Sequence, residues 1–102
     1  VDRGAKALAG APGEQVTEGL DGLRERLAEY SALGARFAKW RAIITIGPGL
    51  PTNRAVLANA HALARYAALC QEAGVVPIVP AAISRATLSI ATEATENGQP
   101  DE

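Results

Sequence analysis

The sequence predicts an α/β fold in which helices alternate with strands. Three observations predict it: two stretches with helical periodicity, an apolar run after each of them, and a glycine (Gly34 or Gly74) directly behind each helix. Repeated helix-strand units of this kind feed a parallel sheet. Doubly wound sheets and (β/α)8 barrels both show this order of elements, so the pattern alone leaves the two architectures open.

Length and composition limit what the chain can be. It has 102 residues, 48% of them hydrophobic and 21% charged, which is typical of one globular domain or a piece of a larger one. The net charge of −1 argues against a nucleic-acid-binding module. Its strongly apolar runs, residues 42–44 and 75–79, are far shorter than the roughly 20 residues that span a bilayer. Without an initiator Met or a signal peptide, we expect a truncated, cytoplasmic chain.

The first half of the chain begins with a Gly-, Ala- and Pro-rich stretch over residues 4–16, which we interpret as a loop. Thr17 is a candidate helix N-cap, with Glu18 and Asp21 in the first turn. The helix that follows ends at Gly34. Its apolar face is expected to contain Leu20, Leu23, Leu27, Tyr30 and Leu33.

Residues 37–44 are rich in β-branched and aromatic side chains, and they predict a strand. Alternation places Phe37, Lys39, Arg41 and Ile43 on one face of it. Ala38, Trp40, Ala42 and Ile44 take the other face, which can pack on helices.

A second helix is predicted over residues 54–73, capped by Thr52 or Asn53 and ended by Gly74. A buried parallel strand is predicted over residues 75–79. The tail from Pro80 onward is poorly specified, with a weak helix at residues 84–96. The apolar stripe of the second helix is expected to contain Val56, Ala60, Leu63, Ala64, Ala67 and Cys70.

Lys39 and Arg41 are the most informative pair of side chains. Two cations at alternate strand positions project from one face, about 6.6–7 Å apart. On an open sheet they would form a solvated surface. In an internal parallel strand their burial costs several kcal/mol each unless anions meet them. We therefore favour a site for carboxylates or a phosphorylated substrate, in which the lysine beside another cation is a candidate acid, base or nucleophile.

Other reactive side chains are given structural interpretations. Cys70 is expected to be a buried thiol, and His61 to have a structural or surface role, because one histidine builds no metal site. Trp40 is expected to pack between sheet and helix. Asp2 lies where a strand would end, which is the face at which barrel active sites form. No phosphate-binding glycine motif opens either helix.

Four segments, in their order and spacing, resemble class I fructose-1,6-bisphosphate aldolase. The resemblance covers residues 1–79, and its most specific part is the strand segment followed by the Ala-Asn helix. The segments are Gly-Leu-Asp-Gly-Leu (19–23), Phe-Ala-Lys-Trp-Arg (37–41), Ala-Asn-Ala-His-Ala-Leu-Ala-Arg-Tyr-Ala (58–67) and Val-Pro-Ile-Val (76–79).

The resemblance implies a partial (β/α)8 TIM barrel over residues 1–79, with about two and a half βα units of a fold that needs about 250 residues. It also implies a cytoplasmic glycolytic lyase, a homotetramer, acting on fructose 1,6-bisphosphate through a Schiff base, with no metal or other cofactor. Lys39 corresponds to a catalytic lysine that binds substrate and transfers protons. Arg41 corresponds to the arginine that holds a substrate phosphate.

The tail, residues 80–102, diverges from this family. The family continues its fifth strand as Val-Glu-Pro-Glu, in which the first glutamate is the main acid/base, whereas Pro80-Ala81-Ala82 follows Val79 here. The Schiff-base lysine would lie beyond Glu102. We therefore expect an inactive piece of an aldolase that is not stable alone. The alternatives are a non-catalytic interaction or regulatory piece that pairs through open sheet edges, and a short enzyme with Lys39 as its nucleophile.

Overall fold

The computed structural model describes residues 1–85. Their elements follow the predicted alternation after an N-terminal hairpin. In chain order they are β1 (Ala5–Ala7), β2 (Gln15–Thr17), α1 (Leu23–Ala32), β3 (Phe37–Lys39), β4 (Ala42–Ile46), α2 (Asn53–Glu72), β5 (Val76–Ile78) and β6 (Ala81–Arg85).

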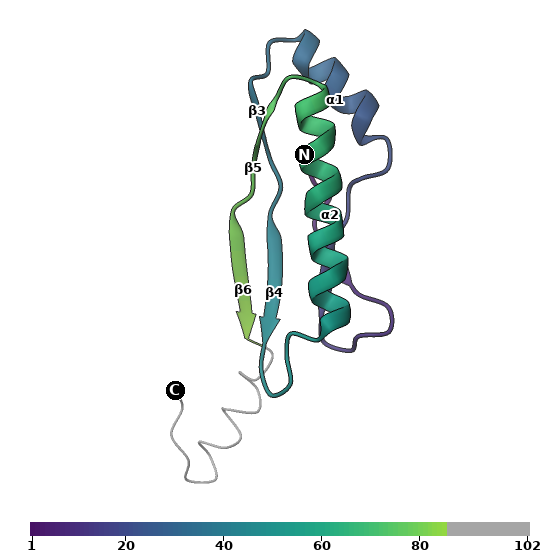
Figure 1. Cartoon of the computed structure of the whole chain (residues 1–102), viewed down its shortest axis with the longest axis vertical. Helices are drawn as coiled ribbons and strands as arrows, with labels where there is room; N and C mark the ends of the chain where they lie inside the picture. Colours follow the sequence, from purple (N-terminus) through teal and green to yellow (C-terminus); the bar gives the residue numbers. More distant parts are fainter. Residues whose placement is uncertain (86–102) are drawn as a thin grey trace.

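Two parallel strand pairs form the sheet. β3 pairs with β5, with Phe37 opposite Val76, and β4 pairs with β6, with Ala42 opposite Ala81. Figure 1 shows α2 running back along these strands, so that α2 connects the segment of β3 and β4 to the parallel segment of β5 and β6. The predicted α/β fold with parallel strands is therefore confirmed.

The predicted strand at residues 37–44 is interrupted at Trp40 and Arg41, although its register is unbroken. The amides of Trp40 and Ala42 still donate to the carbonyls of Ile78 (3.0 Å) and Pro80 (3.1 Å). In this register the carbonyl of Trp40 would accept from residue 80, but proline has no N–H. Pro80 therefore separates the ladder into β3–β5 and β4–β6.

Helix α2 agrees with its predicted bounds, but its buried face does not. Thr52 caps it, since its side chain accepts a hydrogen bond from the Ala55 amide (3.2 Å). Apart from Cys70, which is buried as predicted, the expected stripe is wrong by about one position, because alanines on every side of this helix mark no single face. Val56 is 44% exposed, and the buried residues are Ala55, Asn59, Ala62, Tyr66 and Cys70.

Helix α1 starts later than predicted. Its N-cap is Gly22, in the left-handed conformation with φ 69°, and the predicted cap Thr17 belongs to β2. Leu23 and Leu27 are buried as expected, but Tyr30 and Leu33 are 38% and 85% exposed. The apolar face is therefore shorter than the sequence suggests.

The stretch predicted as a loop contains a hairpin. β1 and β2 pair antiparallel, with Lys6 opposite Val16. The buried carboxylate of Glu14 accepts hydrogen bonds from the amide (2.9 Å) and hydroxyl (2.6 Å) of Thr52. Asn59 donates to the carbonyl of Gln15 (3.0 Å). These long-range contacts stabilise two strands of only three residues each, of which β1 (Ala-Lys-Ala) consists of residues with low β-propensity.

Two predictions about the C-terminal strands need correction. Residues 75–79 do form a parallel strand around β5, but Val76 is 61% exposed, so the segment is not buried on both faces. Ser84 and Arg85 belong to β6 rather than to a helix, because their backbone pairs with β4. The rest of the predicted weak helix lies outside the described residues.

Among residues 1–85, a cluster of buried side chains joins both helices to the sheet. Trp40, Tyr66 and Cys70 have no exposed surface, and the rings of Trp40 and Tyr66 lie 5.1 Å apart. The predictions for Trp40 and Cys70 are therefore confirmed. The cluster consists of Leu23, Leu27, Ala38, Trp40, Ala62, Tyr66, Cys70 and Val75.

Within residues 1–85, neither helix is long and apolar enough to cross a membrane.

Candidate functional site

The predicted site residues lie on the sheet face opposite α2. Trp40 is buried against the helix, and its neighbours Lys39 and Arg41 are exposed on the other face. Exposed Phe37 shares that face, and Ile78, opposite Lys39 in the register, is 38% exposed. The placement of both cations on one face agrees with the sequence analysis. Their face is uncovered within the described residues, rather than the interior wall that we expected.

The backbone around these two residues is held from both edges. On one edge the ladder to β5 continues through the amide of Trp40. On the other edge the N-terminal amine of Val1 donates to the carbonyl of Lys39 (2.8 Å). The amide of Arg41 donates to Oδ2 of Asp2 (2.9 Å), and the hydroxyl of Thr17 donates to the carbonyl of Arg41 (2.6 Å).

Tyr66, a buried residue of α2, binds the backbone of the same segment from the helix side. Its hydroxyl donates to the carbonyl of Ala38 (2.8 Å), accepts from the amide of Ile78 (3.1 Å) and lies 2.9 Å from the Ile78 carbonyl. Burial raises the pKa of Tyr66 to about 12, and burial also raises the pKa of the Cys70 thiol. Tyr66 is therefore neutral and acts as a bridge between β3 and β5, and the thiol is not activated as a nucleophile.

The two exposed cations of this face are able to bind an anion. Lys39 and Arg41 offer positive charge at about 6.6–7 Å spacing along the strand. No ion-pair partner of either side chain occurs among residues 1–85. The same part of the chain contains no cluster of three metal-ligating side chains. A phosphate-bearing molecule satisfies such a pair, because arginine binds phosphate through parallel hydrogen bonds and lysine acts as a point charge.

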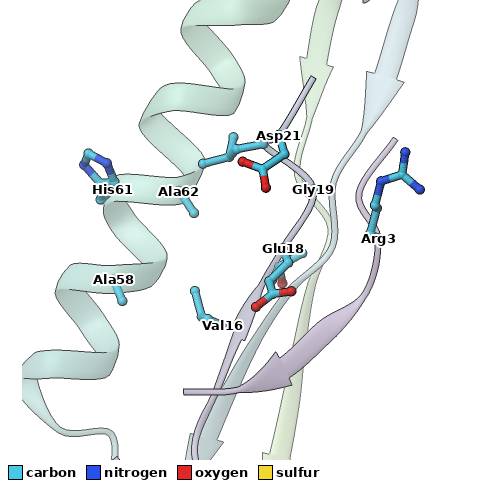
Figure 2. A pocket seen from close by; sticks show the side chains of 10 residues that line it. Arg3, Val16, Glu18, Gly19, Asp21, Ala58, His61 and Ala62 are labelled. Atoms are coloured by element: carbon cyan, nitrogen blue, oxygen red, sulfur yellow. The ribbon is translucent and has the colours of Figure 1, made fainter. Parts of the chain in front are cut away.

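A separate pocket of about 430 Å³ lies between α2 and the segment around β2. Figure 2 shows the carboxylates of Glu18 and Asp21 at this pocket, whereas the imidazole of His61, which is also a lining residue, points away from them on the outer side of α2. Neither Lys39 nor Arg41 lines it. The exposed His61 contributes to its rim, in line with the surface role that the sequence suggested.

Sequence reasoning did not identify Thr17 and Tyr66 as supports of the site. Thr17 is assigned to a helix cap by its sequence neighbours, and Tyr66 is absent from the predicted stripe. Asp2 is noted only for its position near a strand end. The contact from Asp2 to Arg41 spans 39 residues of sequence, so no local pattern contains it.

Parallel strands with α2 packed on one face, and two exposed cations on the other, define the chain as part of an α/β protein built from parallel strand–helix–strand units. Comparison with known proteins identifies the family. A model described as "Glycolytic: Fructose-bisphosphate aldolase class-I" matches residues 1–94. The chain belongs to this family, as the sequence resemblance indicated.

Relatives from bacteria and plants agree with this assignment. The chain is 71% identical over 79 residues to a probable fructose-bisphosphate aldolase class 1 of Xanthomonas campestris, covering 78% of this chain and 24% of that protein. It is 58% identical to the cytoplasmic isozyme of Spinacia oleracea, again covering 78% of this chain and 22% of the relative. The chain therefore spans about a quarter of the length of the relatives that it matches.

A solved structure supports the fold. Fructose-bisphosphate aldolase from Plasmodium falciparum, in complex with TRAP and a small-molecule inhibitor, is similar with a TM-score of 0.77 and 39% sequence identity. The match covers 95% of this chain and 29% of the solved chain. The prediction of a partial (β/α)8 barrel is confirmed.

Proposed function

We propose that this chain provides the substrate-binding wall of a class I fructose-bisphosphate aldolase. The reaction is the reversible cleavage of fructose 1,6-bisphosphate into dihydroxyacetone phosphate and glyceraldehyde 3-phosphate. Lys39 binds substrate and takes part in proton transfer, and Arg41 binds a substrate phosphate. One observation supports these roles: in a chain of this family, both cations lie on the sheet face that carries no helix.

The exposure of the two cations is compatible with these roles. Exposed charges bind an anion weakly, because water screens the attraction and competes for the same hydrogen bonds. A phosphate with two negative charges compensates in part, since each cation interacts with it separately. Covering the face with further barrel strands would lower the local dielectric constant and strengthen both interactions. We therefore expect measurable but weak binding by this chain.

The proposal extends to the location and the assembly of the protein. We propose a cytoplasmic protein, since relatives from Spinacia oleracea and Arabidopsis thaliana carry the names cytoplasmic and cytosolic. The partner is a phosphorylated sugar, and the assembly suggested by the family resemblance is a homotetramer. We keep residues 1–79 as the aldolase-like segment and residues 80–102 as the divergent one.

The chain by itself is proposed to be catalytically inactive. The acid/base glutamate that the family resemblance leads us to expect after Val79 is replaced in this sequence by Pro80 and two alanines. Proton transfer at the reacting carbons needs a group of that kind within hydrogen-bond reach. Turnover of fructose 1,6-bisphosphate by the 102-residue chain, surviving a Lys39→Ala change, would contradict the proposed roles.

Binding tests the proposal directly. Fructose 1,6-bisphosphate is titrated into the chain by calorimetry, together with Lys39→Ala, Arg41→Ala and the control Lys6→Ala, which removes an exposed cation from β1. Each site variant should weaken binding about tenfold, the effect of losing one charge-assisted contact. The control should change it less than twofold. Equal weakening by all three variants would show that only net charge matters.

A specific observation favours one second function, that of a non-catalytic piece that pairs with other chains. Phe37, Val76 and Val79 are 56%, 61% and 40% exposed, which leaves apolar surface beside open strand edges. Light scattering after size exclusion distinguishes this reading. A mass above that of the monomer which falls after Phe37→Lys would support pairing, and a monomer would contradict it.

The reading in which Lys39 is itself the nucleophile has its own test. A Schiff base formed with dihydroxyacetone phosphate is fixed by borohydride reduction and located by peptide mass mapping. Because we assign Lys39 to binding and proton transfer, we expect no adduct there. A stoichiometric adduct on Lys39 would replace our assignment with a short, self-contained enzyme.

A further inference from the structure

The side chain of Arg41 depends on its backbone for its position. It is exposed, and it has no ion-pair partner among the residues that the structure describes. Its direction from the sheet is therefore set by the peptide groups on either side of its Cα atom. Those groups lie at the interruption between β3 and β4, where Pro80 removes one ladder hydrogen bond.

Two side chains from elsewhere in the chain hold these peptide groups. Asp2 accepts the Arg41 amide at 2.9 Å, and Thr17 donates to the Arg41 carbonyl at 2.6 Å. Thr17 is only 3% exposed, so water competes little for its hydrogen bond. Side-chain hydrogen bonds therefore hold both peptide groups of Arg41.

Asp2 does this without neutralising the cation. Its second oxygen, Oδ1, accepts the Gly4 amide at 2.8 Å. Both carboxylate oxygens are therefore occupied by peptide N–H groups rather than by the guanidinium of Arg41. The positive charge of Arg41 stays available for an anion, although the Asp2 carboxylate accepts a hydrogen bond from the Arg41 amide.

We infer that Asp2 and Thr17 are positioning residues for Arg41, which fix its side chain for binding a sugar phosphate. This inference rests on the proposed function. It makes a prediction opposite in sign to simple electrostatics. Removing the negative charge of Asp2 should strengthen phosphate binding if only the local potential matters. It should weaken binding if the carboxylate holds Arg41 in place, because misplaced groups lose binding and rate together.

The test uses the 102-residue chain with fructose 1,6-bisphosphate as probe. The variants are Asp2→Asn, Thr17→Val and Thr17→Ser, with Glu29→Gln as control, since Glu29 is exposed on α1. Asn keeps the size of Asp but presents an NH2 group to a peptide N–H. Asp2→Asn and Thr17→Val should each raise Kd about tenfold, and Thr17→Ser and the control less than twofold.

A second readout does not depend on the ligand. Amide hydrogen exchange at Arg41 should accelerate about tenfold in Asp2→Asn, while amides in the middle of α2 keep their protection. A general loss of folding would accelerate exchange throughout α2 as well. Unchanged exchange at Arg41, or tighter phosphate binding in Asp2→Asn, would overturn the inference.

Arg41→Ala separates this inference from the proposed function. If the unmodified chain and Arg41→Ala bind the bisphosphate equally, the proposed function fails and the inference fails with it. If Arg41→Ala weakens binding while Asp2→Asn and Thr17→Val leave it unchanged, only the inference is overturned. Weakening by all three variants, with recovery in Thr17→Ser, supports both.

Discussion

Replacing Tyr66 with Phe removes one hydroxyl from the contact between β3 and β5. The ring stays packed on Trp40, at 5.1 Å between centroids, so the change isolates the hydroxyl. That hydroxyl donates to the Ala38 carbonyl at 2.8 Å and accepts from the Ile78 amide at 3.1 Å. With about 1 kcal/mol for each hydrogen bond, the free energy of unfolding should fall by about 2 kcal/mol.

Urea unfolding followed by circular dichroism measures this loss. Tyr30→Phe is the matched control, because Tyr30 is 38% exposed on α1 and Tyr66 is fully buried. The control should change stability by less than about 0.5 kcal/mol, as most surface substitutions do. If Tyr66→Phe and Tyr30→Phe have the same effect, the hydroxyl does not join the strands and the reasoning is refuted.

Three further predictions concern burial and pH. The raised pKa of Tyr66 means that its ionisation disfavours the folded state, so stability should fall as pH rises from 10 toward 12, with this loss absent in Tyr66→Phe by pH-dependent denaturation. Glu14→Gln weakens the buried contact with Thr52 and should cost about 1–2 kcal/mol in urea unfolding. Leu27→Ala should cost about 2–5 kcal/mol by the same measurement, whereas Leu33→Ala, at an 85% exposed position, should cost almost nothing.

Local signals in the sequence predict a large part of this fold. The cap at Thr52, the helix behind it and the glycine at residue 74 follow from side-chain chemistry within a few residues. The two strands on either side of α2 follow from apolar runs bounded by glycine. Alternation also places Lys39 and Arg41 on one face, because a strand has a period of two.

Other features depend on contacts that no local pattern contains. The hairpin of β1 and β2 is stabilised by Glu14 and Asn59 through groups 38 and 44 residues away. The buried face of α2 is predicted about one position away from the observed one, because the many alanines of this helix do not distinguish one face from another. Tyr66 is recognisable as a core residue only from its contact with Trp40. The supports of the candidate site, Asp2 and Thr17, belong to the same class of tertiary contact.

The most direct measurement is the NMR mapping of a bisphosphate titration. Side-chain resonances of Lys39 and Arg41 are followed as fructose 1,6-bisphosphate is added, with His61 as an internal reference at the pocket on the helix side. We predict that the lysine and arginine resonances shift together with one dissociation constant while His61 is unaffected. Shifts confined to His61 and its neighbours, with Lys39 and Arg41 unchanged, would contradict the account.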